Sequence, residues 1–341
     1  MFRNFLAVLL IAHSTCGLAQ PKIGIFEKWL DARGIERNVI IHDDTSVGGG
    51  RGLIASCRLE PGVVAAFVPV SATLRLEGGP YDEDDNWAGV LASNLMHQAE
   101  LGTGSQYAEY VDLGLPKEAP LTPCRWSTRE RSSLQSEKFI KECLENSFWR
   151  RKQAIAHGGS NNKSFMRMLD LVCSRTLRGR DGSRQLVPLI DMANHAPEEA
   201  GGGHFAIDEK GNVALIVGRK GIDEGQPVTM DYGARTVEEF LLHYGFVPDR
   251  CSSDIVHVER DGELVPLSWA DCVGYRGHQD PYVREAALHK LQSFPTSLKD
   301  DVSIMNGMQD VISEALRSAL SYRLSKKSLL ACLAGSHDYL L

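Results

Sequence analysis

Residues 188–195 read Pro-Leu-Ile-Asp-Met-Ala-Asn-His, and residues 230–235 read Met-Asp-Tyr-Gly-Ala-Arg. A third stretch, residues 243–247, follows soon after and reads His-Tyr-Gly-Phe-Val. Together they supply an Asn, His residues and two Tyr side chains with few basic groups, and they lack a ready pair of nucleophile and base. This combination favours a site that binds a small organic cofactor and holds an amine in line for attack.

The composition bounds the kinds of protein this chain can be. It has 341 residues, 43% of them hydrophobic, which is ample for one large domain or two smaller ones. The net charge of −7 argues against nucleic acid or an anionic membrane surface as a partner. The 32 glycines are typical of a structure with many turns, such as a loop-rich β fold.

The first twenty residues have the order of a secretory signal. Arg3 precedes an apolar run over residues 5–12, and small residues then lead to a possible cleavage site after Ala19. The alternative is a short buried or anchor helix. The run is too short for a permanent membrane span, and no later segment is long and apolar enough for one, so we expect no stable membrane insertion after the leader is removed.

The cysteines indicate a reducing compartment. Without Cys16 in the leader an odd number remains, widely scattered and without the spacing of a disulfide framework: Cys57, Cys124, Cys143, Cys173, Cys251, Cys272 and Cys332. An organelle reached through the secretory pathway, such as a complex plastid, reconciles free thiols with a signal-like leader. Nucleophilic roles for Cys57, Cys173 or Cys251 are not expected, because no nearby His is arranged to activate them.

The first part of the chain predicts a small-strand β layout. An amphipathic helix over residues 22–34 is followed by strands at 39–41, 53–55 and 63–68, and strands return at 213–217 and 227–230. The regular alternation of strands and helices that marks a doubly wound sheet is missing from this pattern.

Two regions have the apolar spacing that predicts helices. The first covers about residues 87–164 and contains a predicted helix at 127–150, and a further helix is expected at 166–177. After Pro248 the glycines thin out, and residues 281–293 and 308–333 carry helical apolar spacing. We therefore expect a domain boundary near 250–265.

The glycine-rich run at residues 48–52 resembles a phosphate loop only superficially. A phosphate-binding glycine turn opens into a helix, whereas the residues after this run, 53–59, read as a strand. A hairpin turn is one interpretation. The other is a strand edge whose exposed backbone lets a cofactor lie against it.

A metal site is not expected around residues 191–204. Asp191, Asn194, His195 and His204 have no His pair at helical spacing, and Pro188 and Pro197 argue against one continuous helix. Asp191 and Asn194 could instead satisfy buried backbone groups. Of the two tyrosines, Tyr232 follows a predicted strand end and precedes Gly233, which suits a hydroxyl pointing into a cleft, whereas Tyr244 could equally be a core aromatic.

Several motifs occur in the order found in SET-domain methyltransferases. They are Gly50-Arg51-Gly52-Leu53, Ser174-Arg175, Pro188-x-x-Asp191-x-x-Asn194-His195, Tyr232-Gly233 and residues 239–246, Glu-Phe-Leu-Leu-x-Tyr-Gly-Phe. Over roughly residues 35–335 the chain resembles the branch typified by the plant Rubisco large-subunit lysine methyltransferase. Each motif alone is weak, and the Asn-His and Tyr motifs are specific in combination.

The resemblance implies an α+β architecture with S-adenosylmethionine as cofactor and methylation of a protein lysine. In that branch a β-rich SET fold carries a helical insert, here about residues 80–165 within a catalytic domain at 21–250. An all-helical C-terminal domain follows, here residues 255–341, and binds the protein substrate.

The resemblance also implies roles for individual residues. Tyr232 would be the catalytic tyrosine, and Tyr244 would help to close the lysine channel. The implied cofactor-binding residues are Gly50, Arg51, Leu53, Asn194 and His195. The implied substrate-binding residues are Ser174, Arg175, Leu177 and Asp191, with Ser174, Arg175 and Asp191 offering main-chain carbonyls to the amine and Leu177 giving an apolar wall that favours lysine over histidine.

Three other interpretations remain open from the sequence. The family also includes protein-histidine methyltransferases. A non-catalytic protein-binding module could persist on a SET scaffold, although the retained Tyr232, Asn194 and His195 argue against it. A secreted interaction domain would require disulfide bonds.

Overall fold

A computed structural model describes residues 21–44, 50–76, 86–158, 163–179, 182–249, 251–272, 277–307 and 312–336. The chain divides into two compact units, the first formed by Met1–Ala119 with Lys152–Gly233 and the second by Pro120–Arg151 with Ala234–Leu341. The predicted leader and Gly48-Gly49 lie outside the described residues, so both remain predictions. The domain boundaries expected from the sequence also remain predictions.

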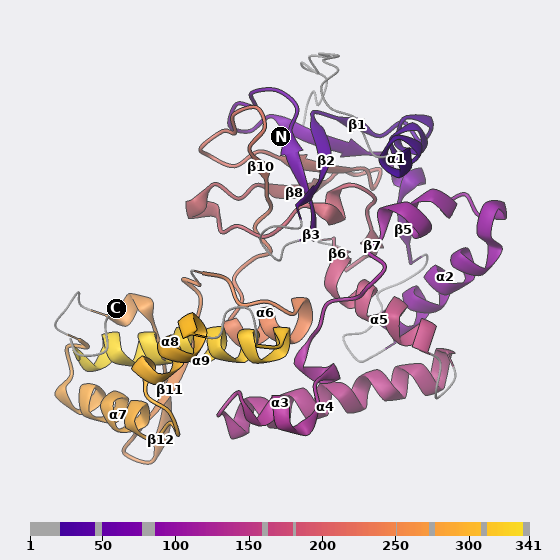
Figure 1. Cartoon of the computed structure of the whole chain (residues 1–341). Helices are drawn as coiled ribbons and strands as arrows, with labels where there is room; N and C mark the ends of the chain where they lie inside the picture. The colour runs from indigo at the N-terminus through magenta and orange to yellow at the C-terminus, as the bar shows by residue number, and fades with distance from the viewer. Residues whose placement is uncertain are drawn as a thin grey trace. The chain divides into compact units, whose positions relative to one another are not determined.

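The first unit is built on three small antiparallel sheets (Figure 1). One has the order β1-β4-β9-β8, with strands Glu36–Arg37, Val64–Val68, Val213–Ile216 and His204–Ile207. The second has the order β10-β3-β2, with Pro227–Val228, Gly50–Ala55 and Val39–Asp44. The third has the order β5-β7-β6, with Leu74–Arg75, Arg184–Leu186 and Leu177–Arg178. The strands predicted from the apolar runs are thus confirmed, the last in a shorter form.

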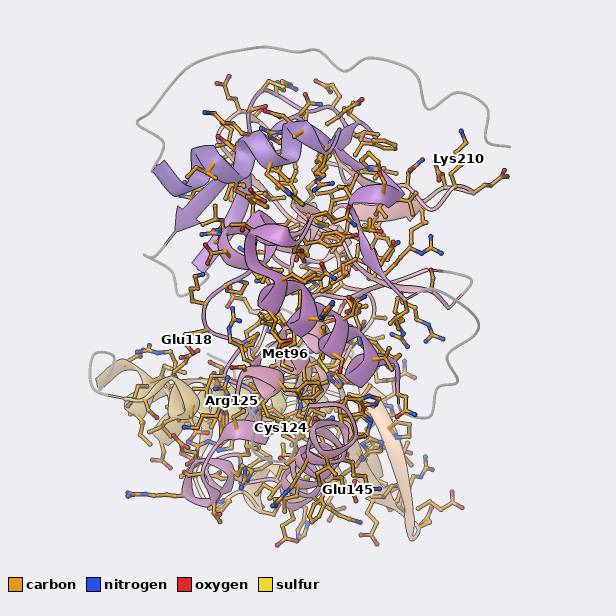
Figure 2. The ribbon with its side chains drawn as sticks, turned by 90° about the vertical axis from the view of Figure 1, so that its right-hand side faces the viewer. Met96, Glu118, Cys124, Arg125, Glu145 and Lys210 are labelled. Carbon is orange, nitrogen blue, oxygen red and sulfur yellow. The ribbon has the colours of Figure 1, made fainter. Side chains whose placement is uncertain are left out.

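Residues 50–52 of the glycine-rich run belong to β3. β2 and β3 pair antiparallel from Val39↔Ala55 to Asp44↔Gly50, so the chain continues as a strand after the run, not as a helix. A phosphate site of the dinucleotide-binding type, which needs a helix N-terminus at this point, is therefore excluded here. Lys210 belongs to another hairpin turn of this unit, between β8 and β9, and its side chain projects outward (Figure 2).

Helices complete the first unit. They are α1 (Pro21–Ala32), α2 (Trp87–Leu101), η3 (Tyr110–Gly114), η5 (Ala154–Gly158) and α5 (Lys163–Arg175), of which η3 and η5 are π-helical. The apolar face of α5 buries Phe165, Leu169 and Val172. α1 ends just before Gly34, whose φ of 69° suits only a glycine without strain. Short 3-10 turns occur at η1 (Val70–Ala72), η2 (Gly102–Gly104), η6 (Ile190–Met192) and η7 (Glu198–Ala200).

The second unit is mainly helical. Its elements are η4 (Pro123–Arg125), α3 (Thr128–Ser132), α4 (Glu137–Gln153), α6 (Val237–Tyr244), β11 (Ile255–Arg260), β12 (Glu263–Ser268), η8 (Trp269–Asp271), α7 (Pro281–Gln292), α8 (Leu298–Gly307) and α9 (Glu314–Ala334). The two helices expected at residues 281–293 and 308–333 are confirmed as α7 and α9, while residues 308–311 lie outside the described residues. The hairpin β11–β12 was not predicted.

The prediction of one continuous helix over residues 127–150 is wrong, because the structure has two helices there, α3 and α4. Gln135 has φ of 54°, which breaks the helix between α3 and α4. The Ser136 hydroxyl then accepts a hydrogen bond from the main-chain N–H of Phe139 at 3.3 Å and starts α4. Buried Leu134 anchors the break in the core.

Buried ion pairs hold the helices of the second unit together. The carboxylate of Asp301 on α8 receives hydrogen bonds from Arg323 at 2.5 and 3.1 Å and from Lys327 at 2.6 Å, both on α9. Lys327 also donates to the Thr296 carbonyl at 2.7 Å. Removing one partner would leave unpaired charge in the core, which is costly. Within the described parts of the chain, no helix combines the length and apolar character that crossing a membrane requires.

Candidate functional site

Segments distant in sequence meet around Met230 in the first unit. The main-chain N–H of Met230 donates to the Asn194 carbonyl at 2.9 Å, and its carbonyl accepts from the N–H of Ala196 at 3.2 Å. Met230 thereby forms parallel bridges with both His195 and Gly203. These bonds fix the Asn-His segment against the chain that leads directly into Tyr232.

Tyr232 contacts the Asn-His segment through three groups. Its hydroxyl donates a hydrogen bond to the Ala193 carbonyl at 2.8 Å, and its main-chain N–H donates to Nδ1 of His195 at 3.3 Å. The two rings lie 5.1 Å apart at 47°. Since Nδ1 accepts, a neutral His195 carries its proton on Nε2. The half-buried Tyr232 is thus oriented from both its backbone and its ring.

The glycine-rich start of β3 lies against the Asn-His segment. A Cβ atom at Gly52 would lie 2.8 Å from Nδ2 of Asn194, so the backbone of β3 approaches the amide as only glycine allows. Asn194 is exposed, and its neighbour Ala193 is buried. Leu53 packs in the core and pairs with Ile41 on one side and Val228 on the other, which fixes the position of β3 in its sheet. Of the predicted cofactor-binding residues, the structure brings Gly52's strand, Asn194 and His195 together.

Arg51 extends from β3 to the π-helix η3. Its guanidinium donates to the main-chain carbonyl of Leu113 and, at 3.4 Å, to that of Gly114. The side chain therefore anchors the strand to the helical insert. Gly50 begins β3 opposite Asp44. The main chains of Gly50 and Arg51 therefore belong to the same strand as Gly52.

Asp191 is the most deeply buried charged group of the site. Its Oδ2 accepts a hydrogen bond from the Tyr110 hydroxyl at 2.7 Å and lies 3.9 Å from Nη1 of Arg175. The same Nη1 donates to the main-chain carbonyl of Asp191 at 2.6 Å. Burial raises the pKa of the carboxyl to about 6, against the lowering effects of Arg175, Tyr110 and Arg51. Burial, reinforced by the charge of Asp191, raises the pKa of Tyr110 well above its usual value.

Two polar atoms at this position lack a partner among the described residues. They are Oδ1 of Asp191 and Nε of Arg175, both buried. Each such group is costly unless something hydrogen-bonds it, so each atom is a place for a hydrogen bond to an ordered water or a ligand.

The backbone before Asp191 is strained. Leu189 has φ of 71° and ψ of −54°, close to the rare γ-turn conformation that few non-glycine residues adopt. Its buried side chain and the bonds of the following 3-10 turn hold it there. Strain of this kind collects at functional sites, where the surrounding structure enforces it.

The other predicted substrate-binding residues lie at and after the end of α5. Ser174 is half-buried, and its hydroxyl donates to the Leu171 carbonyl at 3.2 Å. Leu177 is buried and pairs with Gln185 in β6. Ser174 and Leu177 both belong to the first unit and lie within two residues of Arg175 in the sequence.

Tyr244 belongs to the second unit. It ends α6, where its ring lies 6.0 Å from Phe240 and 6.3 Å from Phe246, and the Arg235 guanidinium carbon lies 5.5 Å from the ring centre. Burial raises the pKa of its hydroxyl. These contacts describe a packed aromatic, which is one of the two interpretations left open by the sequence.

Sequence reasoning missed Tyr110 and the carbonyls of Ala193 and Leu113. Tyr110 lies 81 positions from Asp191, and nothing in its neighbourhood marks it as polar in function. Main-chain carbonyls carry no residue-type signal at all. Only the folded chain shows these groups beside the predicted ones.

Metal ligation has no support in the parts of the chain that the structure describes, where no group of three or more His, Cys, Asp or Glu side chains could hold an ion. His204, for example, starts β8 as an exposed residue.

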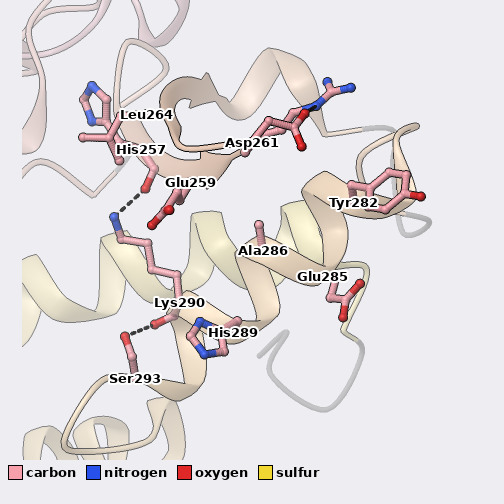
Figure 3. Close-up of a pocket in the computed structure, with 11 residues that line it drawn as sticks. His257, Glu259, Asp261, Leu264, Tyr282, Glu285, Ala286, His289, Lys290 and Ser293 are labelled. Atoms are coloured by element: carbon pink, nitrogen blue, oxygen red, sulfur yellow. Dashed lines mark hydrogen bonds and ion pairs between the residues drawn. The ribbon is translucent and has the colours of Figure 1, made fainter.

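A separate pocket of ≈ 580 Å³ lies within the second unit (Figure 3). β11, β12 and α7 line it, with exposed Leu264 and Tyr282 among its walls. Lys290 donates to the His257 carbonyl inside it, and the Ser293 hydroxyl donates to the Lys290 carbonyl at 2.7 Å. None of the predicted site residues lines this pocket.

Comparison with known proteins gives structural relatives only. No family profile matches the sequence, and no similar protein was found among the curated proteins. The structure is similar to the SET domain of LSMT bound to lysine and AdoHcy, with TM-score 0.67 and 16% identity, over 92% of this chain and 90% of that chain. It is similar to Rubisco LSMT bound to AdoMet, with TM-score 0.67, and to the same protein bound to sinefungin and monomethyllysine, with TM-score 0.68, each at 16% identity over 93% of this chain and 91% of that chain. The α+β architecture expected from the motifs is confirmed, and the chain has the fold of the Rubisco LSMT SET structures.

Proposed function

We propose that this protein transfers a methyl group from S-adenosylmethionine to a lysine side chain of a protein substrate. The observation that carries the proposal is the convergence of Gly52, Asn194, His195 and Tyr232 in one cluster on this fold. The structural relatives were solved with AdoMet, AdoHcy, lysine or monomethyllysine, which agrees with a reaction between such partners.

The chemistry of the site fits S-adenosylmethionine. The exposed Asn194 amide, which lies against the backbone of Gly52, and His195 offer hydrogen bonds to a polar cofactor. When bound, the cofactor supplies an electrophilic methyl group on a positively charged sulfur.

Tyr232 acts by orientation in this proposal. Its hydroxyl donates to the Ala193 carbonyl, and the oxygen of a phenol can also accept, here from an incoming amine or from a polarised methyl C–H. No general base is needed at this position if the amine arrives neutral. Holding the reacting atoms in line supplies much of the acceleration of such a displacement.

The amine must lose its proton before it reacts. Free lysine has a pKa of about 10.4, and a water-excluding channel next to positive charge lowers it. We assign the amine-facing carbonyls to Ser174, Arg175 and Asp191. The Asp191 carbonyl already accepts from Arg175, and its second lone pair remains for the amine.

Lysine is favoured over histidine because Leu177 is buried and apolar beside Arg175. An imidazole would need a hydrogen-bonding wall for its second nitrogen, which Leu177 does not provide. Tyr244 remains assigned to the lysine channel as part of the same proposal.

We also propose that residues 255–341 dock the protein substrate. The pocket of Figure 3 is lined by the carboxylates of Glu259, Asp261 and Glu285 and by the cations of Arg260 and Lys290, and the exposed carboxylate of Glu285 can pair with a basic side chain of a peptide. If Glu285→Lys leaves substrate KM unchanged, the pocket is not the docking site.

Entry into the secretory pathway, on the way to an organelle such as a plastid, completes the proposal. It rests on the leader at residues 1–20 alone. A fluorescent reporter fused to residues 1–40 should leave the cytosol, and a reporter that stays there would contradict the proposal.

The experiment that tests the proposed activity uses purified protein without residues 1–20, methyl-labelled S-adenosylmethionine and a plastid-plus-nuclear protein extract. Mass spectrometry of the labelled band should locate the methyl group on a lysine. A label on histidine would favour the histidine methyltransferase. Protein that neither transfers label nor binds the cofactor would favour a binding module on this scaffold.

A further inference from the structure

We propose that Tyr110 is a positioning residue for the methyl-transfer site, and that the π-helix η3 connects the cofactor side of this site with its amine side. This inference rests on the proposed function. It assigns a role to a segment of the helical insert that none of the motifs contains.

η3 contacts both sides of the site. From its first residue, the Tyr110 hydroxyl donates to Oδ2 of Asp191 at 2.7 Å. From its last turn, the carbonyls of Leu113 and Gly114 accept from the guanidinium of Arg51. One element of five residues therefore holds a residue assigned to the cofactor and a residue assigned to the amine. π-Helical turns are rare and occur frequently at functional sites.

η3 is itself rigidly placed. The Tyr110 ring is fully buried and stacks on Trp29 at 6.3 Å and 13°. A Cβ atom at Gly114 would lie 2.8 Å from the Tyr110 ring and 2.9 Å from that of Phe26, so the helix packs tightly against α1. The hydroxyl is thus delivered to Asp191 from a fixed ring, at little entropic cost.

Among the described residues, three side chains act on the charge of Asp191. They are the Tyr110 hydroxyl, the guanidinium of Arg175 and, at longer range, the guanidinium of Arg51. Burial raises the pKa of Asp191 to about 6, so the carboxyl is mainly ionised at neutral pH and loses its charge in mild acid. Ionised Asp191 attracts Arg175, whose Nη1 bonds the Asp191 carbonyl assigned to the amine.

Tyr110 therefore acts through Asp191 on the carbonyl that faces the amine. Its hydrogen bond lowers the pKa of Asp191 and keeps the carboxylate charged in the working range of pH. Tyr110→Phe keeps the ring and its stacking and removes only this bond.

The test compares Tyr110→Phe with a matched control, Tyr107→Phe. Tyr107 lies in the same insert, is also buried, and donates its hydroxyl to the Thr73 carbonyl at 2.8 Å, whereas Tyr110 donates to Asp191. In Tyr110→Phe, we expect the acid limb of kcat/KM to move to higher pH by about one unit, while S-adenosylmethionine affinity at pH 8 changes less than about threefold. Tyr107→Phe should leave the acid limb in place.

A double-mutant cycle separates positioning from general damage. In an Asp191→Asn background, Tyr110→Phe should have no further effect on the pH profile, because the carboxyl whose ionisation the Tyr110 bond favours is absent. An unchanged acid limb in Tyr110→Phe, or an equal shift in Tyr107→Phe, overturns the inference.

A readout without turnover distinguishes this inference from the proposed function. A carbon-13 NMR titration of the Asp191 carboxyl should show a higher midpoint in Tyr110→Phe than in the wild type. A shifted midpoint with an unchanged kinetic profile overturns the positioning role and leaves the proposed function intact. A wild-type protein that transfers no methyl group overturns the proposed function, and the positioning role with it.

Discussion

The Tyr232 hydroxyl donates a hydrogen bond to the main-chain carbonyl of Ala193, with 2.8 Å between the two oxygens. Ala193 immediately precedes the Asn-His pair, so this bond joins the proposed catalytic tyrosine to the segment proposed to hold the cofactor. The contact of the Tyr232 N–H with His195 reinforces the connection from the backbone. A substitution that moves the backbone of either segment should therefore also shift the other segment.

Gly52→Ala should weaken S-adenosylmethionine binding. The added Cβ would lie 2.8 Å from Nδ2 of Asn194, closer than van der Waals contact allows, and Asn194 must move away. We expect a rise in the cofactor Kd of about tenfold, or ~1.4 kcal/mol, measured by isothermal titration calorimetry.

Gly104→Ala is the matched control for that variant. A Cβ at Gly104 meets nothing within 4 Å, and its φ is not positive, so the same chemical change carries no clash. Equal loss of affinity in both variants would show that Asn194 is not at the cofactor site.

Stability should depend on pH through His243. Burial, aided by the charges of Arg150 and Arg235, lowers the pKa of His243 to about 4. The unfolded chain, with an ordinary His pKa of about 6.5, binds a proton that the folded protein does not. His243 is therefore neutral and fully stabilising above about pH 6.5, and its contribution is lost as the pH falls toward the folded pKa.

Urea unfolding at pH 7 and pH 5 measures this effect. His243→Gln should reduce the difference in unfolding free energy between the two pH values by about 1–2 kcal/mol. His289→Gln on the exposed face of α7 serves as control and should leave the difference unchanged. A His243→Gln protein with the wild-type pH dependence would disprove the assignment.

Asp301→Asn should destabilise the second unit strongly. The change leaves Arg323 and Lys327, both almost completely buried, without their shared carboxylate. Loss of one partner of a buried ion pair costs about 3–5 kcal/mol, which would appear as a lower urea midpoint.

Glu145→Gln removes the exposed ion pair with Lys141 on α4 and is the comparison for the buried one. Glu145 projects from the helix surface in Figure 2. Its loss should leave the urea midpoint at the wild-type value. A similar drop in both variants would mean that burial does not set the importance of these pairs.

Local patterns explain what the sequence predicted well. Short apolar runs bounded by turn residues placed the strands that include Ile41, Leu53 and Val68. The Asn194-His195 and Tyr232 motifs were proposed as one site, and the structure brings them into contact. Their catalytic roles remain predictions.

Other features depend on information that the sequence holds weakly or not at all. The Tyr110–Asp191 contact joins residues far apart in the chain, and no local pattern specifies it. The break at Gln135 comes from one backbone angle inside a helical pattern. By contrast, Asp261-Gly262 is a strong hairpin signal, with positive φ at both positions, and it could have predicted β11–β12.

The central claim is methyl transfer oriented by Tyr232, and its most direct measurement is single-turnover transfer of label from saturating S-adenosylmethionine, in wild type and Tyr232→Phe. We predict that the variant binds the cofactor within about threefold of wild type, because the main-chain bonds of Met230 and Tyr232 still hold the Asn-His segment, but that it transfers the methyl group at least ~100-fold more slowly, because the hydroxyl that orients the reacting atoms is lost. Equal transfer rates in the two proteins would contradict the account.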